Sequence, residues 1–159
     1  MAIIHAPRPL PAPAPPVAPA PALPPIELLL VEPQFLLRRT VAAVARDMRL
    51  ANPKEVTAIE LAESLVAIYR FDALFLSLDE EEAALALMAR VRQGDTRCAR
   101  DIPIAVTAAA CSTPLALRLK QLEVRRLLLR PFKVKGVLDA IAALREPAPE
   151  RAQAAQAET

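Results

Sequence analysis

The stretch FDALFLSLDEEE, residues 71–82, decides the fold. Its apolar run ALFLSL is interrupted by Ser77, and four consecutive acidic residues follow the run. Apolar residues at nearly every position predict a strand that is covered on both faces, as in a parallel sheet. Functional groups in such sheets gather at the carboxyl ends of strands, so the end of this run is a candidate site.

The rest of the chain repeats this pattern. Short apolar runs predict five strands, at residues 26–31, 55–59, 73–78, 102–106 and 125–129. The segments between them have helical periodicity, as in FLLRRTVAAVARDM, where apolar residues recur every three or four positions. The alternation predicts an α/β domain in which right-handed crossovers place helices on both faces of a parallel sheet.

Composition changes at both ends of the chain. Ten of the 17 prolines lie in residues 1–25, where they alternate with alanine. We expect this segment to be a disordered tether that samples polyproline II conformations, with a docking motif for a proline-reading domain as the alternative. Residues 146–159 lose the apolar periodicity and are expected to form a disordered tail. The folded domain is therefore predicted to span residues 26–145.

Composition also excludes several classes of function. The 20 Lys and Arg residues nearly balance the 18 Asp and Glu residues, so the net charge does not indicate nucleic acid as a partner. No apolar run approaches the roughly 18 residues of a membrane span, and no signal peptide is recognisable, so a cytoplasmic protein is expected. Cys98 and Cys111 lack metal-site spacing and are expected to be reduced thiols.

Four segments together resemble a known family. In order and spacing, they resemble the signature regions of response-regulator receiver domains, the CheY-like domains of bacterial two-component systems. The segments are LLLVEPQFLLRR at 28–39, FDALFLSL at 71–78, DIPIAVTA at 101–108 and LLLRPF at 127–132. The resemblance implies a flavodoxin-like (βα)5 fold with strand order 2-1-3-4-5. It also implies a role in phosphorelay signal transduction.

Matching the family position by position assigns a pocket. The family has two adjacent acids that hold Mg²⁺, an aspartate that accepts a phosphoryl group, a hydroxyl residue and a lysine. The corresponding residues are Glu32, Pro33, Ser77, Thr107 and Arg130, with Ala108 as a competing choice for the hydroxyl position. Two of the three carboxylates are thus replaced. Because Mg²⁺ prefers carboxylate oxygens, we expect no bound metal and no cofactor, and an acyl-phosphate cannot form on Ser77.

The acidic run after Ser77 leaves three interpretations open. Asp79 and the glutamates that follow it suit the start of a helix, where the helix dipole stabilises acids. Alternatively, Asp79 is a displaced phosphoacceptor, in which case Mg²⁺ would be required. Phosphorylation of Ser77 is the third interpretation, although a serine hydroxyl needs a nearby base.

Arg130 needs an anion because arginine stays charged. Glu32, at the neighbouring strand end, is its predicted partner, and the alternative is an arginine that faces solvent. The surrounding segment, residues 118–135, carries seven basic residues against one acid. By the resemblance it covers the fourth helix, the fifth strand and the start of the fifth helix, the family's usual output face.

This basic segment is the predicted partner-binding face. Its residues are Arg118, Lys120, Arg125, Arg126 and Lys133. Their charge favours a protein partner with an acidic surface. Two alternatives remain: a homodimer that forms through the same face, and a face that contacts only solvent. Nucleic acid is disfavoured as a partner because no nucleic-acid-binding motif follows the domain and aromatic residues are scarce in this segment.

Together these features predict a stand-alone, receiver-like module that acts by protein–protein interaction without phosphorylation. The alternative is a phosphorelay response regulator that is phosphorylated on Asp79. A hydrolase that uses Ser77 is disfavoured because the only histidine, His5, lies in the tether and no glycine-rich turn surrounds the serine. The chain is therefore not expected to be an enzyme.

Overall fold

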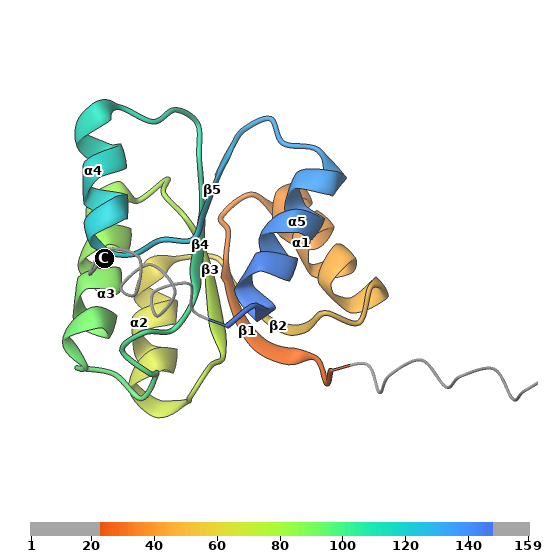
Figure 1. Ribbon diagram of the computed structural model, residues 1–159, viewed down its shortest axis with the longest axis horizontal. Helices are drawn as coiled ribbons and strands as arrows, with labels where there is room; N and C mark the ends of the chain where they lie inside the picture. The colour runs from red at the N-terminus through yellow and green to blue at the C-terminus, as the bar shows by residue number, and fades with distance from the viewer. Residues whose placement is uncertain (1–22, 148–159) are drawn as a thin grey trace, which may run out of the picture.

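The computed structural model describes residues 23–147, in which five strands alternate with five helices (Figure 1). In chain order they are β1 (Ile26–Val31), α1 (Phe35–Asp47), β2 (Ala51–Val56), α2 (Ile59–Ile68), β3 (Ala73–Ser77), α3 (Glu81–Gln93), β4 (Ile104–Ala108), α4 (Thr113–Gln121), β5 (Arg126–Leu129) and α5 (Val134–Arg145). All strand pairs are parallel, in the order β2-β1-β3-β4-β5. The predicted fold class and strand order are confirmed.

The two faces of the sheet bury different side chains of the same strand. In β1, Leu29 and Val31 belong to the core beneath α2, α3 and α4, whereas Leu28 and Leu30 belong to the core beneath α1 and α5. Figure 1 shows these two groups of helices on opposite sides of the sheet. Successive side chains of a strand point to opposite faces, so a strand with helices on both sides must be apolar throughout.

Two strands start two or more residues away from their predicted positions, and the third and fifth strands are each one residue shorter than predicted. The second strand was expected at residues 55–59 but is β2, ANPKEV, which starts at Ala51. It lies at the edge of the sheet and pairs only with β1, and an edge strand tolerates a proline such as Pro53. The fourth strand lies two residues later than predicted, at Ile104–Ala108. This shift brings Thr107 inside the strand instead of after it.

Two of the helices begin at residues that suit a helix start. Helix α3 starts at Glu81, with Glu81 and Glu82 in its first turn, so part of the acidic run does lie at a helix start. Helix α4 starts after Ser112, whose Oγ accepts a hydrogen bond from the Leu115 N–H at 3.2 Å. A side-chain cap of this kind satisfies an otherwise unpaired backbone donor.

The two predicted terminal segments lie almost entirely outside the described residues, apart from 23–25 and 146–147. Within the described part of the chain, no helix is long and apolar enough to cross a membrane. Cys98 and Cys111 are both free thiols. Cys98 is buried, and this burial raises the pKa of its thiol.

Candidate functional site

Three buried polar side chains lie at the carboxyl end of the sheet. Glu32 follows β1, Ser77 ends β3 and Thr107 is the last residue but one of β4; their exposed fractions are 3%, 2% and 1%. They are the buried polar residues among those that the structure describes. Burial of a polar group is unfavourable unless it is hydrogen-bonded, so such a cluster marks a specialised part of the fold.

Ser77 and Thr107 are neighbours across the sheet. They pair with one another in the register of β3 and β4, so Thr107, and not Ala108, is the hydroxyl residue opposite the serine. The Ser77 Oγ accepts a hydrogen bond from the Asp79 N–H at 3.2 Å. The Thr107 Oγ1 is buried and has no hydrogen-bond partner. The Ser77 hydroxyl therefore accepts a backbone hydrogen bond, whereas the Thr107 hydroxyl does not.

Arg130 reaches this cluster from the neighbouring strand. Its backbone N–H donates to the Ala108 carbonyl at 2.8 Å, which extends the ladder beyond the end of β5. Its guanidinium forms a two-point ion pair with Asp79, through Nη1 to Oδ2 at 3.2 Å and through Nη2 to Oδ1. The exposed fractions of the two side chains are 14% and 31%.

The predicted pair between Arg130 and Glu32 is therefore wrong, because the carboxylate that binds the guanidinium belongs to Asp79. Glu32 uses its Oε1 to accept a hydrogen bond from the Gln34 N–H at 3.0 Å, within its own loop. Glu32 still acts on Arg130 through the charge between them. The interpretation of Arg130 as a free, solvent-facing side chain is also wrong.

The pKa values of the two carboxyl groups of the site are shifted in opposite directions. Burial raises the pKa of Glu32, and the nearby Asp79 carboxylate raises it further, while the Gln34 N–H and the Arg130 charge oppose this rise. The hydrogen bond from Arg130 lowers the pKa of Asp79. Asp79 is therefore the carboxyl group that keeps its charge, and protonation of Glu32 is made easier.

These residues do not fit a magnesium ion. Pro33, in the second acidic position of the resemblance, is exposed and has no side-chain oxygen. Of the remaining carboxylates, Asp79 is bound by Arg130, and the environment of Glu32 disfavours its charged form. Mg²⁺ requires several hard, negatively charged oxygen ligands. Within residues 23–147, no three His, Cys, Asp or Glu side chains are grouped closely enough to hold a metal.

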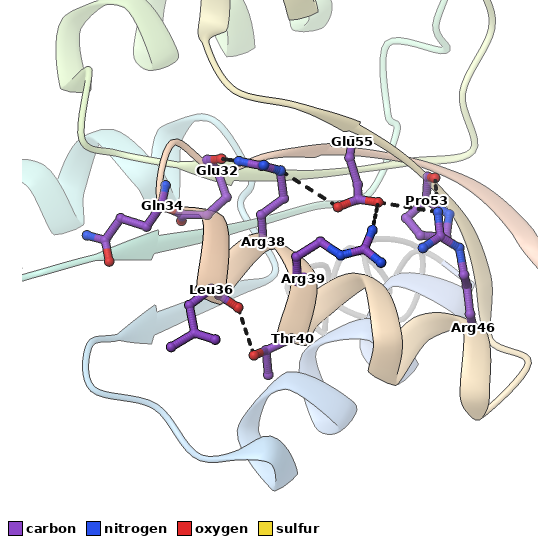
Figure 2. Close-up of polar contacts among 9 residues, drawn as sticks. All are labelled: Glu32, Gln34, Leu36, Arg38, Arg39, Thr40, Arg46, Pro53 and Glu55. Carbon is purple, nitrogen blue, oxygen red and sulfur yellow. Dashed lines mark hydrogen bonds and ion pairs between the residues drawn. The ribbon is translucent and has the colours of Figure 1, made fainter.

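The loop that carries Glu32 is held by an arginine cluster that the sequence interpretation missed (Figure 2). Arg38 donates from Nη1 to the Glu32 carbonyl at 3.0 Å, and its Nε lies 3.7 Å from Glu55 of β2. Arg39 and Arg46 also contact Glu55, at 3.0 and 3.4 Å. The visible signal was an arginine-rich first helix without acids in its first turn. Its partner on another strand could not be read from the sequence.

The predicted partner-binding residues do not all lie free on one face. Arg118 and Lys120 on α4, Arg126 on β5 and Lys133 before α5 are exposed. Arg125 is only partly exposed, and its Nη1 donates to the Ala143 carbonyl at 2.9 Å and to the Glu146 carbonyl. Arg125 thus joins the start of β5 to the end of α5.

Comparison with solved structures places this geometry in a known fold. A response regulator from Thermotoga maritima superposes with a TM-score of 0.64 at 18% identity, over 77% of this chain and 98% of that one. The chemotaxis response regulator CheY4 of Vibrio cholerae gives a TM-score of 0.66 at 16% identity, over 76% and 98%. The chain has the receiver-domain fold. No protein-family model and no curated protein matches its sequence.

A third receiver-fold structure extends the comparison. HP1043, an orphan response regulator of H. pylori, superposes with a TM-score of 0.64 at 17% identity, over 76% of this chain and 97% of that one. In each case nearly the whole of the solved chain is covered, so the described domain is a full receiver fold. At these identities the likeness establishes the architecture, and the chemistry of the site has to be argued from its own residues.

Proposed function

We propose that this chain is a stand-alone receiver-like signalling module of a bacterial two-component-type system that acts by protein–protein interaction without phosphorylation. The observation that carries the proposal is the Asp79–Arg130 ion pair beside Ser77. In this pair, a carboxylate of the chain itself binds Arg130, the basic residue at the carboxyl end of the sheet. The module is proposed to be cytoplasmic and not an enzyme.

The buried cluster supports this proposal chemically. Ser77 offers a hydroxyl in place of a carboxylate, and it is buried and already bonded to the Asp79 N–H. A serine becomes a nucleophile only when a base removes its proton, and residues 23–147 contain no histidine. Glu32 lies beside Ser77, but burial raises the pKa of its carboxyl group. This shift disfavours the ionised form of Glu32, which is the form that could accept the serine proton. Neither nucleophilic attack nor metal-assisted phosphoryl transfer is favoured.

The ion pair also supports a single conformation of the site. Two parallel contacts between a guanidinium and a carboxylate fix both distance and orientation. The pair joins the loop after β3 to the loop after β5, so a movement of either loop would have to break it. We propose that the module presents a constant surface, and that its output is set by its amount and its partner.

The proposed partner surface combines α4, β5 and the start of α5. Arg118, Lys120, Arg126 and Lys133 provide positive charge there. Three large apolar side chains are exposed on the same elements, namely Leu117, Leu129 and Val134. Apolar contact area within a charged rim suits a protein partner, and the basic rim favours an acidic one. A homodimer through this surface is the alternative.

A second candidate function rests on the exposure of Asp79. Its carboxylate is the more exposed of the two at the site and keeps its charge, as a phosphoacceptor must. Phosphorylation there would require that the pair with Arg130 open. The chain would then be a phosphorelay response regulator with a displaced acceptor, and Mg²⁺ would have to bind in the phosphorylated or transition state.

One experiment separates the two candidates. The wild type, Ser77→Ala and Asp79→Asn are incubated with acetyl phosphate and Mg²⁺, and the intact mass of each is measured. We expect no phosphoryl adduct on any of the three. An adduct that Asp79→Asn abolishes would establish the displaced acceptor, and one that Ser77→Ala abolishes would establish serine phosphorylation. The double variant Pro33→Asp/Ser77→Asp, which restores the missing carboxylates, is the positive control.

A further inference from the structure

An apolar groove lies at the amino end of the sheet, opposite the candidate site. Its volume is about 450 Å³. It is lined by Glu27, Lys54, Leu65, Tyr69, Arg70 and Phe71. These residues come from the starts of β1 and β3, from β2 and from the end of α2, which Figure 1 shows at the lower end of the sheet. No feature of the proposed function uses this groove.

The helix beside the groove has an apolar face that is only partly covered within residues 23–147. Leu61, Ile68 and Tyr69 are largely exposed, and Leu65 is partly buried between them. Their spacing of three and four residues places them on one side of α2. Ile59, Ala62 and Val66, on the other side, supply the core contacts. A contiguous apolar stripe that continues into a groove is typical of a binding surface.

We infer that the proline-rich segment of this chain, residues 1–22, binds in this groove. The segment joins the domain at the same end of the sheet, because residue 23 lies three positions before β1 and Glu27 of β1 lines the groove. The Leu23 carbonyl is fixed by Arg145 Nη2 at 3.0 Å, so the join is anchored. The tether therefore starts at the same end of the sheet as the surface that it is proposed to cover.

The composition of the segment fits the groove. Eight prolines and many alanines leave it almost uncharged, since Arg8 is its only permanently charged side chain. Proline-rich chains are already extended before they bind, so little conformational entropy is lost, and they dock in grooves lined by aromatic side chains. Tyr69 supplies an exposed aromatic ring, and Leu65 and Phe71 continue the apolar floor.

The segment is also long enough. At about 3.1 Å per residue in polyproline II, 12 residues span about 37 Å, which exceeds the diameter of a domain of this size. The segment meets the domain at Leu23 on the α5 side of the sheet, whereas the groove lies on the α2 side. The residues directly before Leu23 therefore have to pass around the end of the sheet. Twelve residues therefore suffice to reach the groove from residue 23, and ten of the 22 residues then remain for binding.

The test uses the full-length chain with a nitroxide spin label at Ala14→Cys, in a background in which Cys111 is replaced by Ser and the buried Cys98 is kept. We expect loss of the amide NMR signals of Lys54, Arg70 and Phe71, while signals at the distant α4 persist. The variant Tyr69→Ser should restore the lost signals. The matched control Leu117→Ser, which changes a side chain with the same 57% exposure on α4, should not restore them.

Two further measurements identify the occupant. Mixing spin-labelled chains with isotope-labelled chains that lack the label should leave the groove signals intact; signal loss in the mixture would mean that a second copy supplies the segment and would overturn the proposal. A short tether gives an effective concentration on the order of 1 mM, so a peptide of residues 1–22 should restore the signals only at millimolar concentration. Signal loss confined to the vicinity of Arg145, beside the join, would also overturn it.

Discussion

Arg130 and Asp79 are 51 positions apart in the chain, yet their side chains meet in a two-point ion pair at the carboxyl end of the sheet. The contact joins the loop after β3 to the loop after β5, and the Asp79 N–H also donates a hydrogen bond to the buried hydroxyl of Ser77. It gives the site an internal carboxylate for its arginine. The stability and pH behaviour of this pair can be measured independently of any partner.

Removing the Asp79 charge should destabilise the fold. In Asp79→Asn the partly buried guanidinium of Arg130 loses its charged partner, at a cost of about 1 kcal/mol, because the pair lies between an exposed and a buried ion pair. Urea unfolding at pH 7 measures the difference. The control is Glu82→Gln, which removes a charge from the first turn of α3 and should change stability by only a few tenths of a kcal/mol. Equal effects would contradict a specific pair.

Acid should remove the contribution of this pair. The pKa of Asp79 is lowered from 3.8, so the unfolded chain binds this proton more readily than the folded one. The stability that Asp79 provides is therefore fully present above about pH 5 and is lost as the pH falls through the folded pKa. Unfolding curves of the wild type and Asp79→Asn should converge in that range. Curves that stay parallel down to pH 3 would show that the ion pair is not the source of the difference.

Glu32 should behave in the opposite sense. Its pKa is raised above 4.5, so the folded chain binds this proton more readily, and wild-type stability falls as the pH rises through the folded pKa. Glu32→Gln keeps an oxygen for the Gln34 N–H but has no proton to lose. The variant should be more stable than the wild type at pH 7, and this advantage should vanish near pH 4. A variant that is less stable at pH 7 would disprove the burial argument.

The two hydroxyls at the site should respond differently to removal. Thr107→Val replaces a buried hydroxyl that has no partner with a methyl group, and should be neutral or stabilising by up to about 1 kcal/mol. Ser77→Ala removes the acceptor of the Asp79 N–H and should cost about 1 kcal/mol. Thermal unfolding of both variants under identical conditions is the test. A destabilised Thr107→Val would mean that its hydroxyl has a partner.

Substitutions at two adjacent arginines, Arg125 and Arg126, should distinguish a structural role from a binding role. Arg125→Glu breaks the contacts with the Ala143 and Glu146 carbonyls and places a negative charge beside them, so it should cost about 1–2 kcal/mol. Arg126→Glu changes an exposed side chain and should leave stability within about 0.5 kcal/mol. Urea unfolding compares them. Only Arg126→Glu then remains suitable for testing association through the basic face.

The sequence determined the architecture because its signal is local and repeated. A strand between two helical layers must be apolar on both sides, and ALFLSL and IELLLV meet that requirement without reference to distant residues. The edge strand β2 was misplaced for the same physical reason. It has neighbours on only one side, so ANPKEV does not need the apolar pattern, and its pairing with β1 fixes its position.

The sequence by itself also determined which residues end or follow the strands: Glu32 and Pro33 after β1, Ser77 at the end of β3 and Arg130 after β5. Only the tertiary structure decided which carboxylate binds the arginine. Glu32 and Asp79 both follow strands that neighbour one another, and their positions in the chain do not distinguish them. The choice depends on a backbone N–H that binds the Glu32 carboxylate and on a turn at Ser77 that leaves Asp79 beside Arg130. Ion pairs act over a few ångströms in space, and the crossover connections set those distances.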